Sequence, residues 1–214
     1  MKLLFINRIA LLLPLCLGAL LLPQAVTAEE NTASAPPEAA AIPEPLHAES
    51  RGRVRIDGKN IDYRATAGTL EMKNDDGEVI AHYGYTAYVQ DGADSRTRPL
   101  LFAYNGGPGS ASMWLHMGIL GPQRTVVEDT AFTTQGPFRY ANNEHSILDR
   151  ADLVMIDPVG TGFSRAVGKG KSEDFWGVSN DIHTVSDFIA RYVTANGRWT
   201  SPKYLLGESY GGIR

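Results

Sequence analysis

The sequence is nearly free of cysteine and has no excess of positive charge. Cys16 is the only cysteine among 214 residues, and it lies in an N-terminal segment that we expect to be removed. No disulfide bond is therefore predicted in the mature chain. Asp and Glu number 24 against 20 Lys and Arg, so the chain lacks the basic surface that nucleic-acid binding requires, and that class is excluded. The 43% of hydrophobic residues are enough for one globular domain with its own core.

The N-terminus has the pattern of a secretory signal. Basic residues precede the apolar run "IALLLPLCLGALLL", and the small residues of "AVTA" follow it, which predicts a signal peptide over residues 1–28. A membrane anchor is the alternative, but a proline and a glycine interrupt the run, which is short for a transmembrane span. We therefore expect an exported protein, periplasmic or secreted, that has no membrane contact once the signal is cleaved.

Composition changes twice along the rest of the chain. Residues 29–50 are rich in Ala, Pro and Glu and poor in large apolar side chains, which predicts a disordered linker. From residue 51 polar and apolar residues alternate, as in "RVRID" and "VIAHYGYTAYVQ", a pattern typical of antiparallel hairpins at the edge of a sheet. Residues 51–214 are therefore predicted to be the folded part.

Three short apolar runs, "LLFAY", "LVMID" and "KYLL", predict strands that are buried on both faces. Between the second and the third run, Ile182, Val185 and Ile189 fall on one face of a predicted helix, with Ser179 or Asn180 as its N-cap. Strands that alternate with a helix favour an α/β fold with parallel strands.

Two glycine-rich segments follow predicted strands. Ser209 lies in "GESYG", directly after "KYLL", a context typical of a nucleophile elbow, in which the serine occupies a strained turn between a strand and a helix. The loop "NGGPGSAS" follows "LLFAY", where backbone N–H groups can point at a developing oxyanion. Taken singly, each segment could also be an ordinary turn at the end of a strand.

Three blocks together resemble a known family. "YNGGPGSAS", "DPVGTGFS" and "YLLGESYGG", in this order and spacing, are similar to the serine carboxypeptidases (peptidase family S10), and in particular to a bacterial-type member. The resemblance covers residues 100–214. It implies an α/β-hydrolase fold, with a mostly parallel central sheet and N-terminal antiparallel hairpins. It also implies an enzyme that removes C-terminal amino acids from peptides or proteins, with no metal and no other cofactor.

The resemblance also implies a role for individual residues. Ser209 matches the nucleophile that forms the acyl-enzyme. The backbone N–H groups of the oxyanion hole match Gly107 and Tyr210, and the group that binds the terminal carboxylate of the substrate matches Asn105, Gly106 and Glu208. Repulsion between two carboxylates would keep Glu208 protonated, so that it donates a hydrogen bond and activity is favoured by acid.

At two positions the sequence departs from the family. Ala111 stands where a serine is usual, which we interpret as tolerated packing. Ile119 stands where several eukaryotic members have another acidic residue of the carboxylate site.

The catalytic partners of Ser209 are not evident. In α/β-hydrolases an Asp or Glu and then a His follow the serine along the chain, but all five histidines here precede Ser209. We therefore expect the N-terminal part of a longer enzyme, inactive alone, whose Asp and His lie beyond Arg214. The alternative is a rearranged triad that uses an upstream histidine.

Two other functions remain open. The same elbow and oxyanion loop would serve another exported α/β-hydrolase, such as an esterase or an acyltransferase. The fold could also belong to a peptide-binding relative without turnover. The sequence makes no prediction of an oligomeric state.

Overall fold

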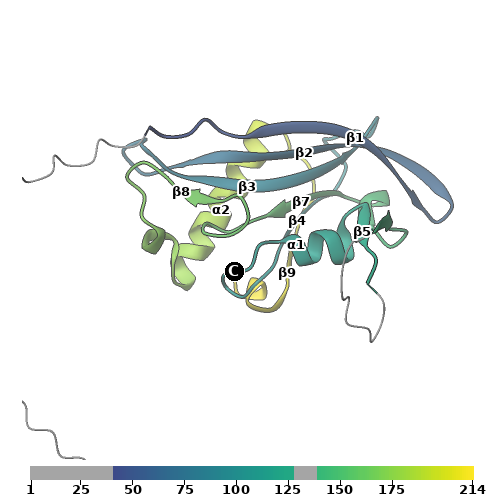
Figure 1. Ribbon diagram of the computed structural model, residues 1–214. Helices are drawn as coiled ribbons and strands as arrows, with labels where there is room; N and C mark the ends of the chain where they lie inside the picture. The colour runs from purple at the N-terminus through teal and green to yellow at the C-terminus, as the bar shows by residue number, and fades with distance from the viewer. Residues whose placement is uncertain (1–40, 128–138) are drawn as a thin grey trace, which may run out of the picture. The chain divides into compact units, whose positions relative to one another are not determined.

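The computed structural model of the protein describes residues 41–127 and 139–214 (Figure 1). The predicted signal peptide and the first part of the predicted linker, residues 29–40, lie outside the described residues. Within the described ranges, no helix is both long enough and apolar enough to cross a membrane.

The described residues form a seven-stranded sheet in which antiparallel and parallel strands meet. Its path is β1-β2-β3-β7-β4-β9, and β8 pairs with β3 away from this path. The bounds in this order are β1 His47–Ile56, β2 Lys59–Lys73, β3 Val79–Gln90, β7 Asp152–Ile156, β4 Leu100–Tyr104, β9 Lys203–Gly207 and β8 Arg165–Ala166. Strands β1, β2 and β3 are antiparallel neighbours, whereas β7, β4 and β9 are parallel to one another. The predicted α/β architecture with N-terminal hairpins is therefore confirmed.

The first strand begins earlier than predicted. Residues 47–50 were assigned to the linker from their composition, but they pair with residues 65–68 of β2. Just before them, Leu46 and Thr69 exchange two hydrogen bonds, each 2.9 Å long. The side chains of residues 47–50 are exposed, so backbone pairing with β2 rather than burial holds this part of the strand, and composition does not reveal that pairing.

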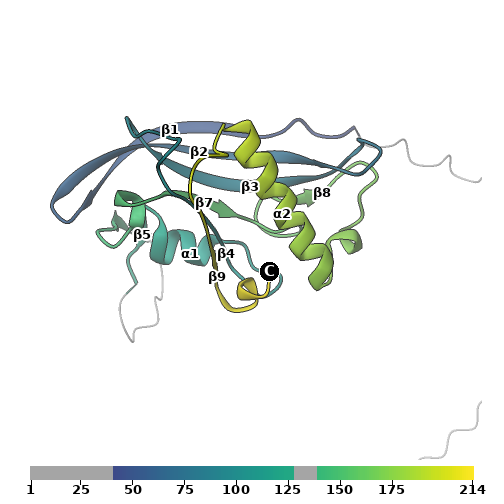
Figure 2. The ribbon, with the colours of Figure 1, turned by 180° about the vertical axis from the view of Figure 1, so that it is seen from behind.

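The two faces of β4 and β7 bury different side chains, as the alternation of a strand requires. On one face, Phe102, Val154 and their neighbours pack against helix α2, Val178–Ala195, which lies over the sheet in Figure 2. On the other face, Leu101 and Leu153 pack against residues from α1, Met113–Leu115, and the π-helix η1, His116–Leu120. Strand β9 was also predicted to be buried on both faces, but it is mostly exposed, because it lies at the end of the described sheet and pairs there with β4 alone.

Helix α2 begins before the predicted N-cap residues. Its N-cap is Gly177, with φ +88°, and Gly177 accepts a hydrogen bond from the Asp181 N–H. Glycine adopts this backbone angle without strain, so the chain can enter the helix earlier than a search for Ser or Asn caps suggests. Val185 packs in the core as predicted, and Phe188, which the periodicity did not single out, is fully buried beside it.

The remaining elements of the described residues are short. They are a two-stranded sheet of β5, Gln123–Thr125, and β6, Tyr140–Asn142, and three 3-10 helices: η2, Ile147–Asp149; η3, Ser172–Phe175; and η4, Ser209–Gly212.

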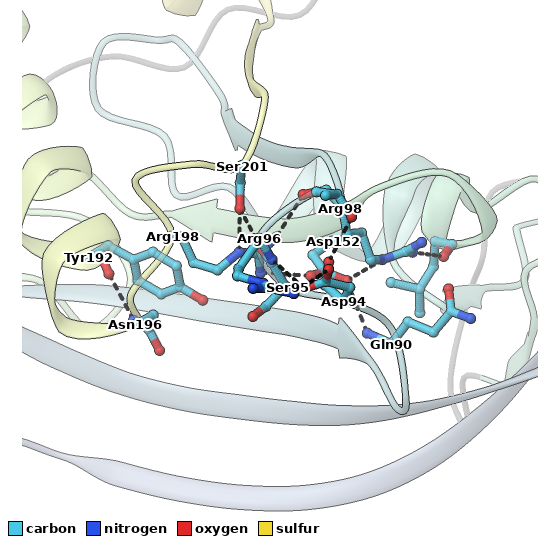
Figure 3. A network of polar contacts seen from close by, with 12 residues as sticks. Gln90, Asp94, Ser95, Arg96, Arg98, Asp152, Tyr192, Asn196, Arg198 and Ser201 are labelled. Carbon is cyan, nitrogen blue, oxygen red and sulfur yellow. Dashed lines mark hydrogen bonds and ion pairs between the residues drawn. The ribbon is translucent and has the colours of Figure 1, made fainter.

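A buried ionic network joins the amino ends of the parallel strands (Figure 3). Asp152 opens β7, and its side chain is 1% exposed. Its Oδ1 accepts hydrogen bonds from Arg98 Nε at 2.7 Å and from the Gln90 N–H at 3.0 Å. Its Oδ2 accepts one from Arg198 Nη1 at 2.7 Å. One carboxylate therefore ties together the segments that lead into β4, β7 and β9.

Candidate active site

Ser209 lies at a sharp turn between β9 and η4. Its φ is +56°, a region that non-glycine residues rarely adopt and that costs conformational energy. Gly207 and Gly211 make this turn possible, because a Cβ atom on Gly207 would collide with the backbone of Gly211, and one on Gly211 would lie 2.8 Å from the Tyr104 carbonyl oxygen. The backbone therefore has the elbow shape that the sequence predicts, with Ser209 exposed at its tip.

The glycine loop leaves the sheet beside this elbow. Strands β4 and β9 pair in parallel, and their last paired residues are Tyr104 and Gly207, so the segments that follow them emerge at the same edge. The two backbones then touch, since a Cβ atom on Gly106 would lie 2.5 Å from the Tyr210 nitrogen and 2.7 Å from the Glu208 carbonyl oxygen. Residue 106 must be glycine for this contact to exist.

Two backbone donors at this contact remain unused. Within the described residues, neither the Gly107 N–H nor the Tyr210 N–H donates a hydrogen bond, whereas the neighbouring Ser110 N–H donates to the Gly106 carbonyl oxygen at 3.1 Å. Gly107 is exposed and Tyr210 is half-buried. Both N–H groups can thus serve an oxygen atom that becomes negatively charged next to Ser209.

The structure brings Asn105 and Glu208 together. Asn105 is 3% exposed, and its Oδ1 accepts a hydrogen bond from the Leu115 N–H at 3.1 Å. This bond fixes the orientation of the amide, so that Nδ2 donates to Glu208 Oε2 at 3.1 Å. Glu208 itself is exposed, and one side of its carboxyl group therefore remains open to a ligand. Ile119 is also exposed.

Two further residues beside the site, Arg214 and Asp157, were not singled out by the sequence analysis. The side chain of Arg214 is buried, and it donates hydrogen bonds to the Asn105 and Pro108 carbonyl oxygens and to the Asp181 carboxylate. No local signal could have revealed this, because Asp181 is 33 residues away and Asn105 is 109 residues away along the chain.

Asp157, in the block "DPVGTGFS", links that block to the glycine loop "NGGPGSAS". Its Oδ1 accepts the Ser112 N–H at 2.8 Å, and a Cβ atom on Gly162 would collide with its carboxylate. Burial raises the pKa of the Asp157 carboxyl, although backbone hydrogen bonds from Ser112 and Phe163 partly oppose this effect. In the block "DPVGTGFS", Asp157 is therefore needed to bind the glycine loop, and Gly162 is needed to leave room for the Asp157 carboxylate.

A cavity of about 560 Å³ opens beside the elbow. Most of its walls are apolar, and Asp181 and Arg214 bring charge to it. The other lining residues include Pro108, Val159, Phe175, Trp176 and Tyr210.

The histidines do not contact the serine. His116 Nε2 is 2.5 Å from the Tyr88 hydroxyl, and burial lowers the pKa of its imidazole. His82 is buried within β3, and its Nε2 has no hydrogen-bond partner among the described residues. No hydrogen bond joins Ser209 to any of the five histidines, all of which lie in the described part of the chain, so no observation favours the rearranged triad.

Comparison with known proteins agrees with the resemblance that the three sequence blocks indicate. A family model described as serine carboxypeptidase matches residues 57–214, a range that contains every residue of the site. Serine carboxypeptidase-like 36 of Arabidopsis thaliana is 27% identical over 155 residues, which cover 72% of this chain and 29% of that protein. Pheromone-processing carboxypeptidase KEX1 of Saccharomyces cerevisiae is 29% identical over 164 residues, which cover 68% of this chain and 20% of that protein. The chain thus spans less than a third of the length of these relatives.

Proposed function

Because the chain belongs to the serine carboxypeptidase family, we propose that it carries the nucleophilic half of an active site that hydrolyses C-terminal peptide bonds. One observation carries the proposal: the strained Ser209 elbow, the glycine loop and the Asn105–Glu208 pair all lie at the carboxyl ends of the neighbouring strands β4 and β9. The proposed nucleophile, the two backbone donors that are free within the described residues and the proposed recognition pair for a carboxylate therefore lie at the same edge of the sheet.

The proposed reaction proceeds through an acyl-enzyme. Ser209 Oγ attacks the carbonyl carbon of the last peptide bond while a general base takes its proton. The Gly107 and Tyr210 N–H groups donate to the oxyanion that forms. The base returns the proton to the leaving amine, the C-terminal amino acid departs, and water then hydrolyses the ester on Ser209.

The general base is proposed to be a histidine, oriented by an Asp, in the remainder of the full-length protein. Serine hydroxyls need such a base, and in this fold the base follows the serine along the chain. The relatives are more than three times as long as the segment that matches them, so their length accommodates such residues.

Recognition of the terminal carboxylate is assigned to Asn105, Gly106 and Glu208. Asn105 Nδ2 is already directed at this place by the bond from Leu115. A substrate carboxylate beside Glu208 repels a second negative charge. Binding therefore requires Glu208 to be protonated, so that its carboxyl donates a hydrogen bond, and we propose that this makes the activity acid-favoured.

The experiment that tests this function uses the full-length protein and a matched pair of peptides that differ only in a free or an amidated C-terminus. We expect the free peptide to lose its last residue and the amide to react at least about 100-fold more slowly in kcat/KM, because the carboxylate contacts are lost. Ser209→Ala should abolish both reactions and labelling by a fluorophosphonate probe. Equal rates on the two peptides would favour an esterase or acyltransferase instead. Peptide binding without labelling would favour a relative that has no turnover.

We also propose that the protein is exported, periplasmic or secreted. The pattern of basic, apolar and small residues over residues 1–28 supports this.

A further inference from the structure

The guanidinium of Arg214 reaches the glycine loop from the side of the elbow. Its Nη1 donates to the Asn105 carbonyl oxygen at 2.5 Å, and its Nη2 donates to the Pro108 carbonyl oxygen at 3.0 Å. The N–H of Arg214 donates to the Tyr210 carbonyl oxygen at 3.2 Å. One residue thus bonds to the elbow through its backbone and to the loop on both sides of Gly107 through its side chain.

Asp181 compensates the buried charge. The Arg214 side chain is 1% exposed and that of Asp181 is 9% exposed. Both carboxylate oxygens accept from the single Nε–H of Arg214, at 2.8 and 2.9 Å. Asp181 lies in the first turn of α2, where the helix dipole stabilises a negative charge. The face of the Tyr210 ring lies 5.3 Å from the guanidinium carbon and adds a cation–π contact.

The way in which Arg214 distributes its hydrogen bonds between Asp181 and the glycine loop indicates the role of the Arg214–Asp181 pair. An Arg–carboxylate pair can form two parallel bonds that use a terminal nitrogen of the guanidinium. Here Asp181 takes only Nε, and both terminal nitrogens bond to carbonyl groups of the loop. A lysine ammonium could neutralise Asp181, but it lacks the planar fork that reaches two carbonyl groups at once.

We propose that Arg214, oriented by Asp181, is a positioning residue that holds the Gly107 N–H at the oxyanion position beside Ser209. The inference rests on the proposed function. Gly107 lies between the two carbonyl groups that Arg214 binds, and its own N–H is free within the described residues. A donor stabilises an oxyanion only if it is held in place before the charge develops. The effect of Arg214 therefore belongs to the transition state and not to substrate binding.

The test compares Arg214→Lys with Arg198→Lys in the full-length protein. Arg198 is an equally buried arginine paired with an aspartate, Asp152, but it lies at the opposite end of β4. Two quantities are measured: amide hydrogen exchange of residues 105–110, and kcat and KM on a peptide with a free C-terminus, well below the unfolding temperature of each variant.

For Arg214→Lys we expect faster exchange in the loop and a fall in kcat on the order of 10- to 100-fold, with KM changed less than about threefold. Arg198→Lys should lower the unfolding temperature and leave loop exchange and kcat unchanged. Should Arg214→Lys not fold, Asp181→Asn, which keeps the guanidinium, provides the same two measurements.

Unchanged loop exchange would overturn the proposal, and so would a loss of activity that appears only in KM or equally in Arg198→Lys. A wild-type protein that hydrolyses no peptide would instead refute the proposed function. Faster loop exchange in Arg214→Lys would then show a structural link alone, and the role in catalysis would be rejected.

Discussion

A Cβ atom at residue 106 would lie within 2.7 Å of two backbone atoms of the elbow, Tyr210 N and Glu208 O. Real Cβ atoms do not approach backbone this closely, so a side chain at this position must push the loop and the elbow apart. These two segments carry the proposed oxyanion donors and the nucleophile. The addition of one methyl group at residue 106 therefore increases the distance between the loop and the elbow.

We predict that Gly106→Ala lowers kcat/KM of the full-length protein by about 100-fold, because a misplacement of about 1 Å has effects of this size. Overpacking should also reduce the free energy of unfolding by about 1–3 kcal/mol. Gly212→Ala is the matched control, since it lies in the same elbow and its Cβ would meet no atom within 4 Å. Peptidase kinetics and chemical denaturation of both variants check this, and equal losses of activity would contradict it.

Glu208 is the residue through which pH should act on substrate binding. If a carboxylate binds only when Glu208 is protonated, KM should rise from acid to neutral pH, while kcat changes less. Glu208→Gln keeps a hydrogen-bond donor that does not titrate, so its KM should be nearly constant from acid to neutral pH. Steady-state kinetics on one peptide across this range test the pair. A constant KM in the wild-type protein would rule out this role of Glu208.

At the scale of elements, the parallel strands are held at both ends by buried aspartate and arginine side chains. Asp152 binds Arg98 and Arg198 at the amino ends of the strands, and Asp181 binds Arg214 near their carboxyl ends. The Asp152 network anchors the amino ends of the strands, and the Asp181–Arg214 pair lies beside the proposed active site. Loss of the Asp152 network should therefore affect stability more than catalysis.

We predict that Asp152→Asn lowers the free energy of unfolding by about 3–5 kcal/mol, because it leaves two buried guanidinium groups without a counter-charge. Asp94→Asn is the control, since Asp94 pairs with Arg96 at the surface, and an exposed pair contributes little. Chemical denaturation at neutral pH measures both. A small effect of Asp152→Asn would mean that water or another group compensates these charges.

Local patterns predicted most of the elements. The apolar runs became β4, β7 and β9. Strands β4 and β7 are buried throughout, as continuous apolar sequence predicts, whereas the predicted burial of β9 was wrong, because β9 lies at the end of the described sheet and is mostly exposed. The start of β1 and the start of α2 were wrong, since the first depends on backbone pairing with β2 and the second on the positive φ of Gly177. Neither feature changes the hydrophobic pattern.

At the scale of the whole molecule, the contacts that the sequence could not reveal are those between distant segments. The glycine loop and the elbow could be recognised as motifs, and the resemblance implied that they meet. The pairing of Arg214 with Asp181 and of Asp152 with two arginines joins residues 33 to 54 positions apart. One sequence contains no signal for such pairs, because a charged residue on its own is equally suited to the surface.

The parallel pairing of β4 with β9 also has a consequence for how the protein folds. Asn105 and Glu208 are 103 residues apart along the chain, so the two halves of the site meet only after a long loop has closed. Pairing over such separations is slow compared with the formation of hairpins such as β1–β2. We therefore expect the proposed oxyanion donors and the serine to come together late in folding. A probe that reacts with Ser209 should consequently report on completed folding, and partly folded chains should not react with it.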